Sequence, residues 1–138
     1  MSSQTEPFGL DRKVLLSTLW IFALLNYIYA DVMTLMNPET IQDLVAGRLG
    51  TMEPSPGFFL GAAVLMETAI VMVLLSRILK HGLNRWLNII AGVLHTLAVL
   101  ASMFVDTPEP YYLFFGTIEI VCTLVIVWLA VQWRAQPA

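Results

Sequence analysis

Four polar side chains that can exchange protons or bind a ligand stand in the middle of long apolar segments. They are Asn26, Glu67, His95 and Glu119. Carboxylic acids and imidazole carry protons, act as acid and base, and bind cations near neutral pH. Placing a charged group at the centre of a bilayer costs about 2.5–3.5 kcal/mol, so each such residue needs a partner, a proton or a function. These residues therefore predict a functional site inside an apolar protein.

Four apolar runs carry these residues. A helix rises about 1.5 Å per residue, so about 20 apolar residues cross a hydrocarbon core about 30 Å thick. Each run has this length and must be helical, because lipid offers no hydrogen-bond partner to an exposed backbone. We therefore predict an all-α fold, a transmembrane four-helix bundle that forms a single domain over residues 1–138. The predicted spans cover residues 14–36, 58–79, 86–105 and 111–133.

The composition agrees with a membrane protein. Hydrophobic residues make up 58% of the chain and charged residues only 12%, whereas a soluble domain carries about 25% charged residues. The net charge of -3 argues against nucleic acid as a partner, because phosphates are met by basic patches. Cys122 is the single cysteine, so no intrachain disulfide forms. No cofactor is expected, and lipid is the first partner.

The connection between the first two runs predicts a short helix on the membrane surface. Asn37 suits the N-cap and Pro38 the first helical position. Apolar residues then recur on one face, while charged residues occupy the other. We predict an amphipathic interfacial helix over residues 38–49, ended by Gly50. A packed extracellular loop is the alternative.

Basic residues gather on one side of this four-span arrangement. Lys and Arg concentrate in cytoplasmic loops, so we predict that both termini are cytoplasmic (N-in/C-in). We expect a multi-pass protein of the bacterial inner membrane. The residues on the predicted inner side are Arg12, Lys13, Arg77, Lys80, Arg85 and Arg134, against Arg48 alone outside. The predicted outer side carries Asp31, Glu39, Asp43, Glu53, Asp106 and Glu109.

Helical spacing places the polar residues beside small residues, on the faces that a bundle buries. We therefore predict that they meet in a pocket near the middle of the membrane. Asp31 either rings the mouth of this pocket or ends its span at the headgroups. No Glu-x-x-His or His-x-x-x-His spacing occurs, so no metal site is expected. The candidate ligand- or proton-binding residues are Glu67, His95, Glu119, Asn26, Tyr29, Asn88 and Asp31.

Three functions fit such a pocket. The first is binding or proton-linked transport of a small ligand by Glu67, His95 and Glu119. The second is a membrane-embedded acid–base enzyme, such as an isomerase acting on a lipid-like substrate. The third is a non-catalytic accessory subunit, in which the polar network only fixes the packing of the helices. Four short helices leave little room inside, so a homodimer enclosing a path is a further option.

The first run also carries a resemblance. The stretch Leu16–Met36, LSTLWIFALLNYIYADVMTLM, resembles the first span of a family of small bacterial four-span membrane proteins of unknown function. Its most recognisable piece is Asn26-Tyr27 followed by Ala30-Asp31. The resemblance runs from about Lys13 to Arg134 and implies the same four-span fold. It implies no activity, because none is assigned to that family.

Overall fold

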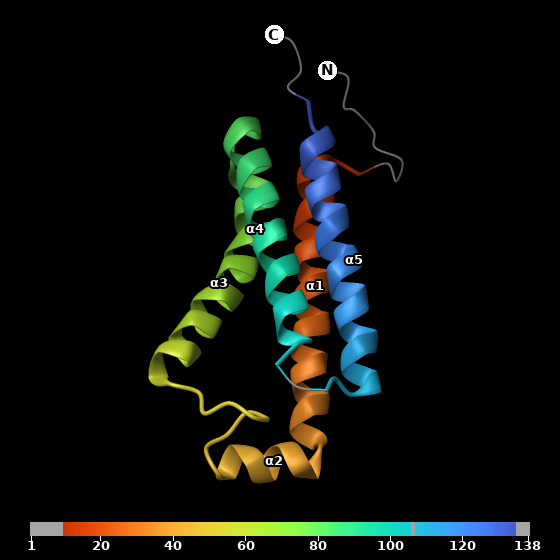
Figure 1. The fold of residues 1–138 in the computed structure, drawn as a ribbon. Coiled ribbons are helices and arrows are strands. Elements are labelled where there is room, and N and C mark those ends of the chain that lie inside the picture. Colours follow the sequence, from red (N-terminus) through yellow and green to blue (C-terminus); the bar gives the residue numbers. More distant parts are fainter. Residues whose placement is uncertain (1–9, 106, 135–138) are drawn as a thin grey trace.

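The computed structural model describes residues 10–105 and 107–134, so Asp106 of the predicted outer side lies outside the described residues. This part of the chain contains no β-strand and is built from helices (Figure 1). Four of these helices are long and apolar enough to cross a membrane. The predicted all-α fold with four spans is confirmed. The helices are α1 (Arg12–Met36), α2 (Pro38–Val45), α3 (Pro56–Ile78), α4 (His81–Ser102) and α5 (Pro110–Gln132).

The helices start where local signals place them. The side chain of Asn37 accepts a hydrogen bond from the backbone N–H of Glu39 at 3.0 Å, and Pro38 opens α2. The Ser55 hydroxyl accepts one from the N–H of Phe58 at 3.2 Å, at the start of α3. Both side chains satisfy N–H groups that the first helical turn leaves unpaired. The predicted cap at Asn37 is thereby confirmed.

α2 is shorter than predicted. It ends at Val45, and Gly47 follows with φ at 76°. Glycine enters this left-handed region without a steric cost, which commonly stops a helix one or two residues earlier. Gly47 rather than Gly50 therefore ends α2. The helix lies across one end of the bundle (Figure 1), and Val45 is 85% exposed. Its place at a membrane surface stays a prediction.

α4 starts earlier than predicted, at His81 rather than at Trp86. Polar side chains in its first two turns are held by neighbouring helices. The Asn84 amide donates to the Ser76 carbonyl at 2.7 Å, and the Arg85 guanidinium donates to the Ala130 carbonyl at 3.1 Å. Hydropathy marks the lipid-facing part of a helix. A prediction based on hydropathy therefore left out the polar first turns of α4, whose side chains are hydrogen-bonded to other helices.

The four long helices form a ring. α1 packs against α3 and α5, and α4 packs against the same two helices, so α1 and α4 face each other across the bundle. The approach of α4 to α5 depends on Gly92. A Cβ atom there would lie 2.6 Å from a methyl group of Val127 and 3.3 Å from the Thr123 carbonyl. No larger residue fits this crossing without displacing its neighbours.

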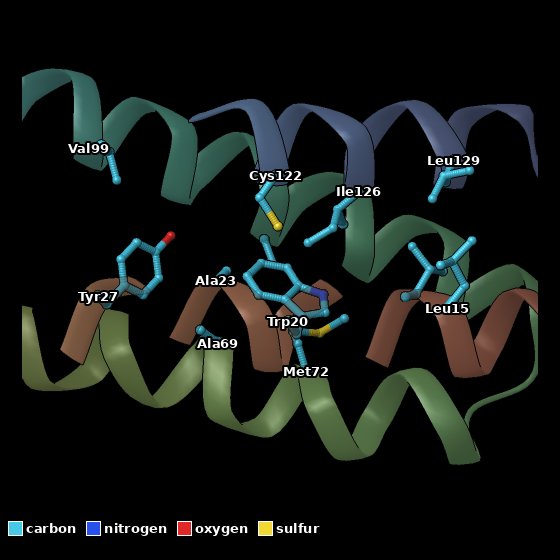
Figure 2. Close-up of a cluster of buried hydrophobic side chains, with 12 residues drawn as sticks. Leu15, Trp20, Ala23, Tyr27, Ala69, Met72, Val99, Cys122, Ile126 and Leu129 are labelled. Carbon is cyan, nitrogen blue, oxygen red and sulfur yellow. The ribbon is translucent and has the colours of Figure 1, made fainter. Parts of the chain in front are cut away.

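Trp20 occupies the centre of the ring. It is fully buried, and its indole lies among side chains from facing helices, including Met72 of α3 and Ile126 of α5 (Figure 2). Its ring nitrogen donates to Asn88 of α4 at 2.8 Å. A hydrogen bond thus crosses the bundle between α1 and α4. The interior of the bundle around Trp20 is therefore filled by side chains.

α3 leaves the bundle in its first half. It lies beside α4 at one end and leans away from the other helices toward α2 (Figure 1). Residues 56–64 are all exposed, whereas Ala69, Met72 and Ser76 in its second half are buried. The bundle is therefore closed at the end where α1 starts and looser at the end where α2 lies.

Candidate functional site

A pocket of about 150 Å³ lies among the four long helices, which all line it, and it is only partly enclosed. Its size matches an engineered cavity of about 150 Å³ that holds one benzene molecule. Tyr27 projects into the space between α1 and α4 (Figure 2). The titratable groups that line the pocket are Tyr27, Asp31, His95, Tyr112 and Glu119.

Glu119 is the residue in this pocket that has a buried, unsatisfied hydrogen-bonding atom. Its side chain is buried, with 5% of the residue exposed. One carboxylate oxygen, Oε1, has no hydrogen-bond partner among the described residues. Burying a carboxylate without compensation costs several kcal/mol, so such a group takes a proton or a positively charged partner. Gly116, Cys122 and Thr123, which share its face of α5 at helical spacing, are buried with it.

Asp31 brings a second carboxylate to the same pocket. It is an exposed residue, lies one helical turn from Tyr27, and lines the pocket together with Glu119. No Lys or Arg of the described chain lines the pocket. Two carboxylates without a cation repel each other, and a positive ligand between them removes the repulsion.

His95 is almost fully buried, and both ring nitrogens are already bonded. The Tyr27 hydroxyl lies 3.2 Å from Nδ1, and the Thr68 hydroxyl lies 2.9 Å from Nε2. Thr68 donates its single hydrogen to the Leu65 carbonyl at 2.6 Å. We therefore assign the hydrogen of the neutral ring to Nε2, which donates to Thr68, while Nδ1 accepts from Tyr27. His95 positions Tyr27 and holds α3 against α4.

Glu67 does not belong to this pocket, so the prediction that it meets His95 and Glu119 is wrong. It is exposed and borders a separate apolar hollow between α3 and α4, beside Val71 and Leu87. The reason is that α3 is apolar almost all round, so its sequence does not fix which side turns inward. The next residue along the chain, Thr68, takes the inward place.

Asn88 and Asn26 are buried, as predicted, but they are used within the fold. Asn88 accepts from the Trp20 indole at 2.8 Å and donates to the side chain of Asn84 at 2.7 Å. Asn26 donates to the carbonyl of Phe22, one turn earlier in α1, at 2.8 Å. Neither asparagine lines the pocket. Both therefore stabilise helices rather than offer a binding group.

Tyr29 is 61% exposed and turned away from the pocket, which corrects its place among the candidates. Tyr27, two residues earlier, points inward instead. The spacing could have shown this, because Tyr27 follows Trp20 by seven residues and so shares its face. Tyr112 precedes Glu119 by seven residues on α5 and so shares its face, but it was not among the candidates. Thr68 carried no periodic signal.

One comparison with known proteins gives a match. A sequence profile described as a family of unknown function, DUF6326, matches residues 7–138. The chain belongs to the DUF6326 family. The resemblance to an uncharacterised family is thereby confirmed. No curated protein and no solved structure matches this DUF6326 chain.

The pocket of this DUF6326 protein offers negative charge, aromatic rings and hydroxyl groups to a small ligand. Two carboxylates attract a cation, and phenol oxygens accept hydrogen bonds from an ammonium group. Aromatic faces add attraction to a cation that has lost its water. Within the described residues, no three His, Cys, Asp or Glu side chains gather as a metal site.

Proposed function

We propose that this protein binds small cations, the proton included, inside the membrane, and that Glu119 is the residue that receives them. One observation carries the proposal. Oε1 of Glu119 is buried without a hydrogen-bond partner among the described residues, on the wall of a pocket that also holds Asp31. A carboxylate that is buried in an apolar interior without such a partner requires a positive ligand to stabilise it.

The volume of the pocket limits the size of the ligand that it can hold. A volume of about 150 Å³ suits a proton with water, a monovalent metal ion, or an ammonium group bearing one or two carbons. Sites for drug-sized ligands usually measure about 300–1,000 Å³. A substrate of sterol size therefore fits the pocket poorly, which weighs against the lipid isomerase. A proton and a cation competing for Glu119 would link the binding of one to the release of the other.

The charge at the closed end supports an orientation. Arg12 donates to the Leu129 carbonyl at 3.0 Å, and Arg85 donates to the Ala130 carbonyl at 3.1 Å. Both cations thus lie at the C-terminal end of α5, where carbonyl groups lack helical partners. By the positive-inside rule, this charge favours a cytoplasmic position for the closed end. We infer a multi-pass protein of the bacterial inner membrane, with α2 and the looser end of the bundle outside.

Calorimetric titration of the full chain in lipid nanodiscs tests the binding. Methylammonium and sodium ions are the probes, and titrations at several pH values reveal competition with protons. We expect the wild-type chain to bind at least one probe, with an affinity that falls as protons are added. Glu119→Gln keeps the shape but removes the charge, so it should weaken binding about tenfold or more.

Glu67→Gln is the matched control, because it makes the same substitution in another span and outside the pocket. It should bind as the wild-type chain does. Equal binding by wild type and Glu119→Gln, or a loss confined to Glu67→Gln, would remove Glu119 from the function. Absence of binding in every chain over millimolar probe would overturn the proposal.

A further inference from the structure

A second, larger hollow adjoins the pocket of Glu119. It has a volume of about 300 Å³ and lies between the α2–α3 connection and the start of α5. Thr34, Thr40, Phe58 and Glu109 are among the residues on its wall. Two residues, Ser102 and Tyr112, line both hollows. The Tyr112 hydroxyl donates to the Ser102 hydroxyl at 2.7 Å, so the wall that the two hollows share carries a hydrogen-bonded pair.

We propose that small cations reach Glu119 from this outer hollow and that the Tyr112–Ser102 pair opens and closes the route. The inference rests on the proposed function, since it concerns access to the same pocket. It adds the side of entry and names the residue that controls it. Tyr112 is a gating residue in this account, and Glu119 remains the binding residue.

The opposite direction is blocked by packed side chains. Trp20, Asn84 and Asn88 are fully buried between the pocket and the end of the bundle where α1 starts. Hydrogen bonds from Trp20 to Asn88, and from Asn88 to Asn84, hold these three side chains together. His95 closes the wall further, because both of its nitrogens are bonded. Passage that way would break a buried network, whereas the outer route requires one bond to open.

The Tyr112–Ser102 pair also lies at the ends of two helices. Ser102 is the last residue of α4, and Tyr112 lies in the first turn of α5. The Ser102 hydroxyl donates its own hydrogen to the Val99 carbonyl at 2.7 Å, so it only accepts from Tyr112. Among the described residues, the phenol is therefore held by one hydrogen bond. Rotation of the tyrosine side chain would break this bond without movement of a helix.

The charge along this route suits a cation. Glu109 borders the outer hollow, and Asp31 and Glu119 border the inner pocket. No Lys or Arg of the described chain lines either hollow. A positive ligand thus meets negative groups at each stage, while an anion meets repulsion.

Cysteine accessibility tests the gate without requiring any bound ligand. In a Cys122→Ser background, Ala98→Cys places a thiol on the wall of the inner pocket. The probe is 2-aminoethyl methanethiosulfonate, a small cationic thiol reagent, applied to the full chain in nanodiscs. We expect Tyr112→Ala to accelerate the reaction at this position about tenfold or more, the effect of losing a barrier of about 1.4 kcal/mol. Tyr112→Phe, which keeps the ring and loses the bond, should give a smaller acceleration.

Thr40→Cys, in the outer hollow, is the control position and should react at the same rate with or without Tyr112. An unchanged rate at Ala98→Cys in Tyr112→Ala would overturn the gate. So would an equal acceleration at both positions, because that indicates general loosening. The acceleration should persist when Glu119 is replaced by Gln. If it does while calorimetry finds no binding, the proposed function fails and the gate stands.

Discussion

Two buried titratable side chains, His95 and Glu119, illustrate what separates a structural residue from a functional one here. Both are shielded from solvent and both line the same pocket. His95 has a partner at each nitrogen, whereas Oε1 of Glu119 has none among the described residues. Burial alone therefore identifies neither role. An unmet hydrogen-bonding requirement is the feature that points to a ligand.

Substitution of Tyr27 tests its hydrogen bond to His95. Tyr27→Phe removes the hydroxyl that donates to Nδ1 of His95, and so leaves a buried acceptor unpaired. We expect a loss of about 1–3 kcal/mol in the free energy of unfolding. Thermal denaturation in detergent should show this as a lower midpoint. Tyr29→Phe, the same change two residues away on the exposed side, should leave the midpoint unchanged. Equal midpoints for the two variants would contradict the assigned bond.

The helices were predictable because their causes are local. A run of apolar residues of bilayer length predicts a span wherever it occurs, and Asn37-Pro38 predicts the start of α2. The inward faces of α4 and α5 were also predictable, because polar and small residues recur there at helical spacing. Asn88 and Glu119 are accordingly buried.

The setting of α3 about its own axis could not be predicted in the same way. Its residues are apolar on every side, so turning it changes the burial of apolar surface very little. Its orientation is fixed by contacts with other helices, such as the hydrogen bond that His95 donates to Thr68. Glu67, the most conspicuous residue of α3, was therefore placed on the wrong side. A pattern in one helix says nothing about partners distant in sequence.

At the scale of the whole molecule, the two ends of the bundle differ. One end is closed by buried packing around Trp20 and by arginine side chains on the last carbonyls of α5. The other end holds the outer hollow, α2 and the exposed first half of α3. Such asymmetry fits a protein that opens its site to one side of a membrane. A homodimer enclosing a path stays a prediction, which the mass of the purified protein in detergent would test.

Thiol labelling of intact cells measures the orientation. In the Cys122→Ser background, Thr40→Cys marks the open end and Gly82→Cys marks the closed end. A membrane-impermeant maleimide should label Thr40→Cys from outside, and Gly82→Cys only after the cells are permeabilised. This pattern follows from the basic residues at the closed end. The reverse pattern would show that the pocket opens toward the cytoplasm.

The most direct test of the account is whether a cation changes Glu119 itself. Infrared difference spectra of the chain in nanodiscs, recorded with and without methylammonium or sodium at fixed pH, report the carboxyl groups that respond. If Glu119 receives the cation, a carboxyl difference band is present in the wild type and in Glu67→Gln, and absent in Glu119→Gln. A band that survives in Glu119→Gln, or no carboxyl band in any chain at saturating cation, would contradict this role.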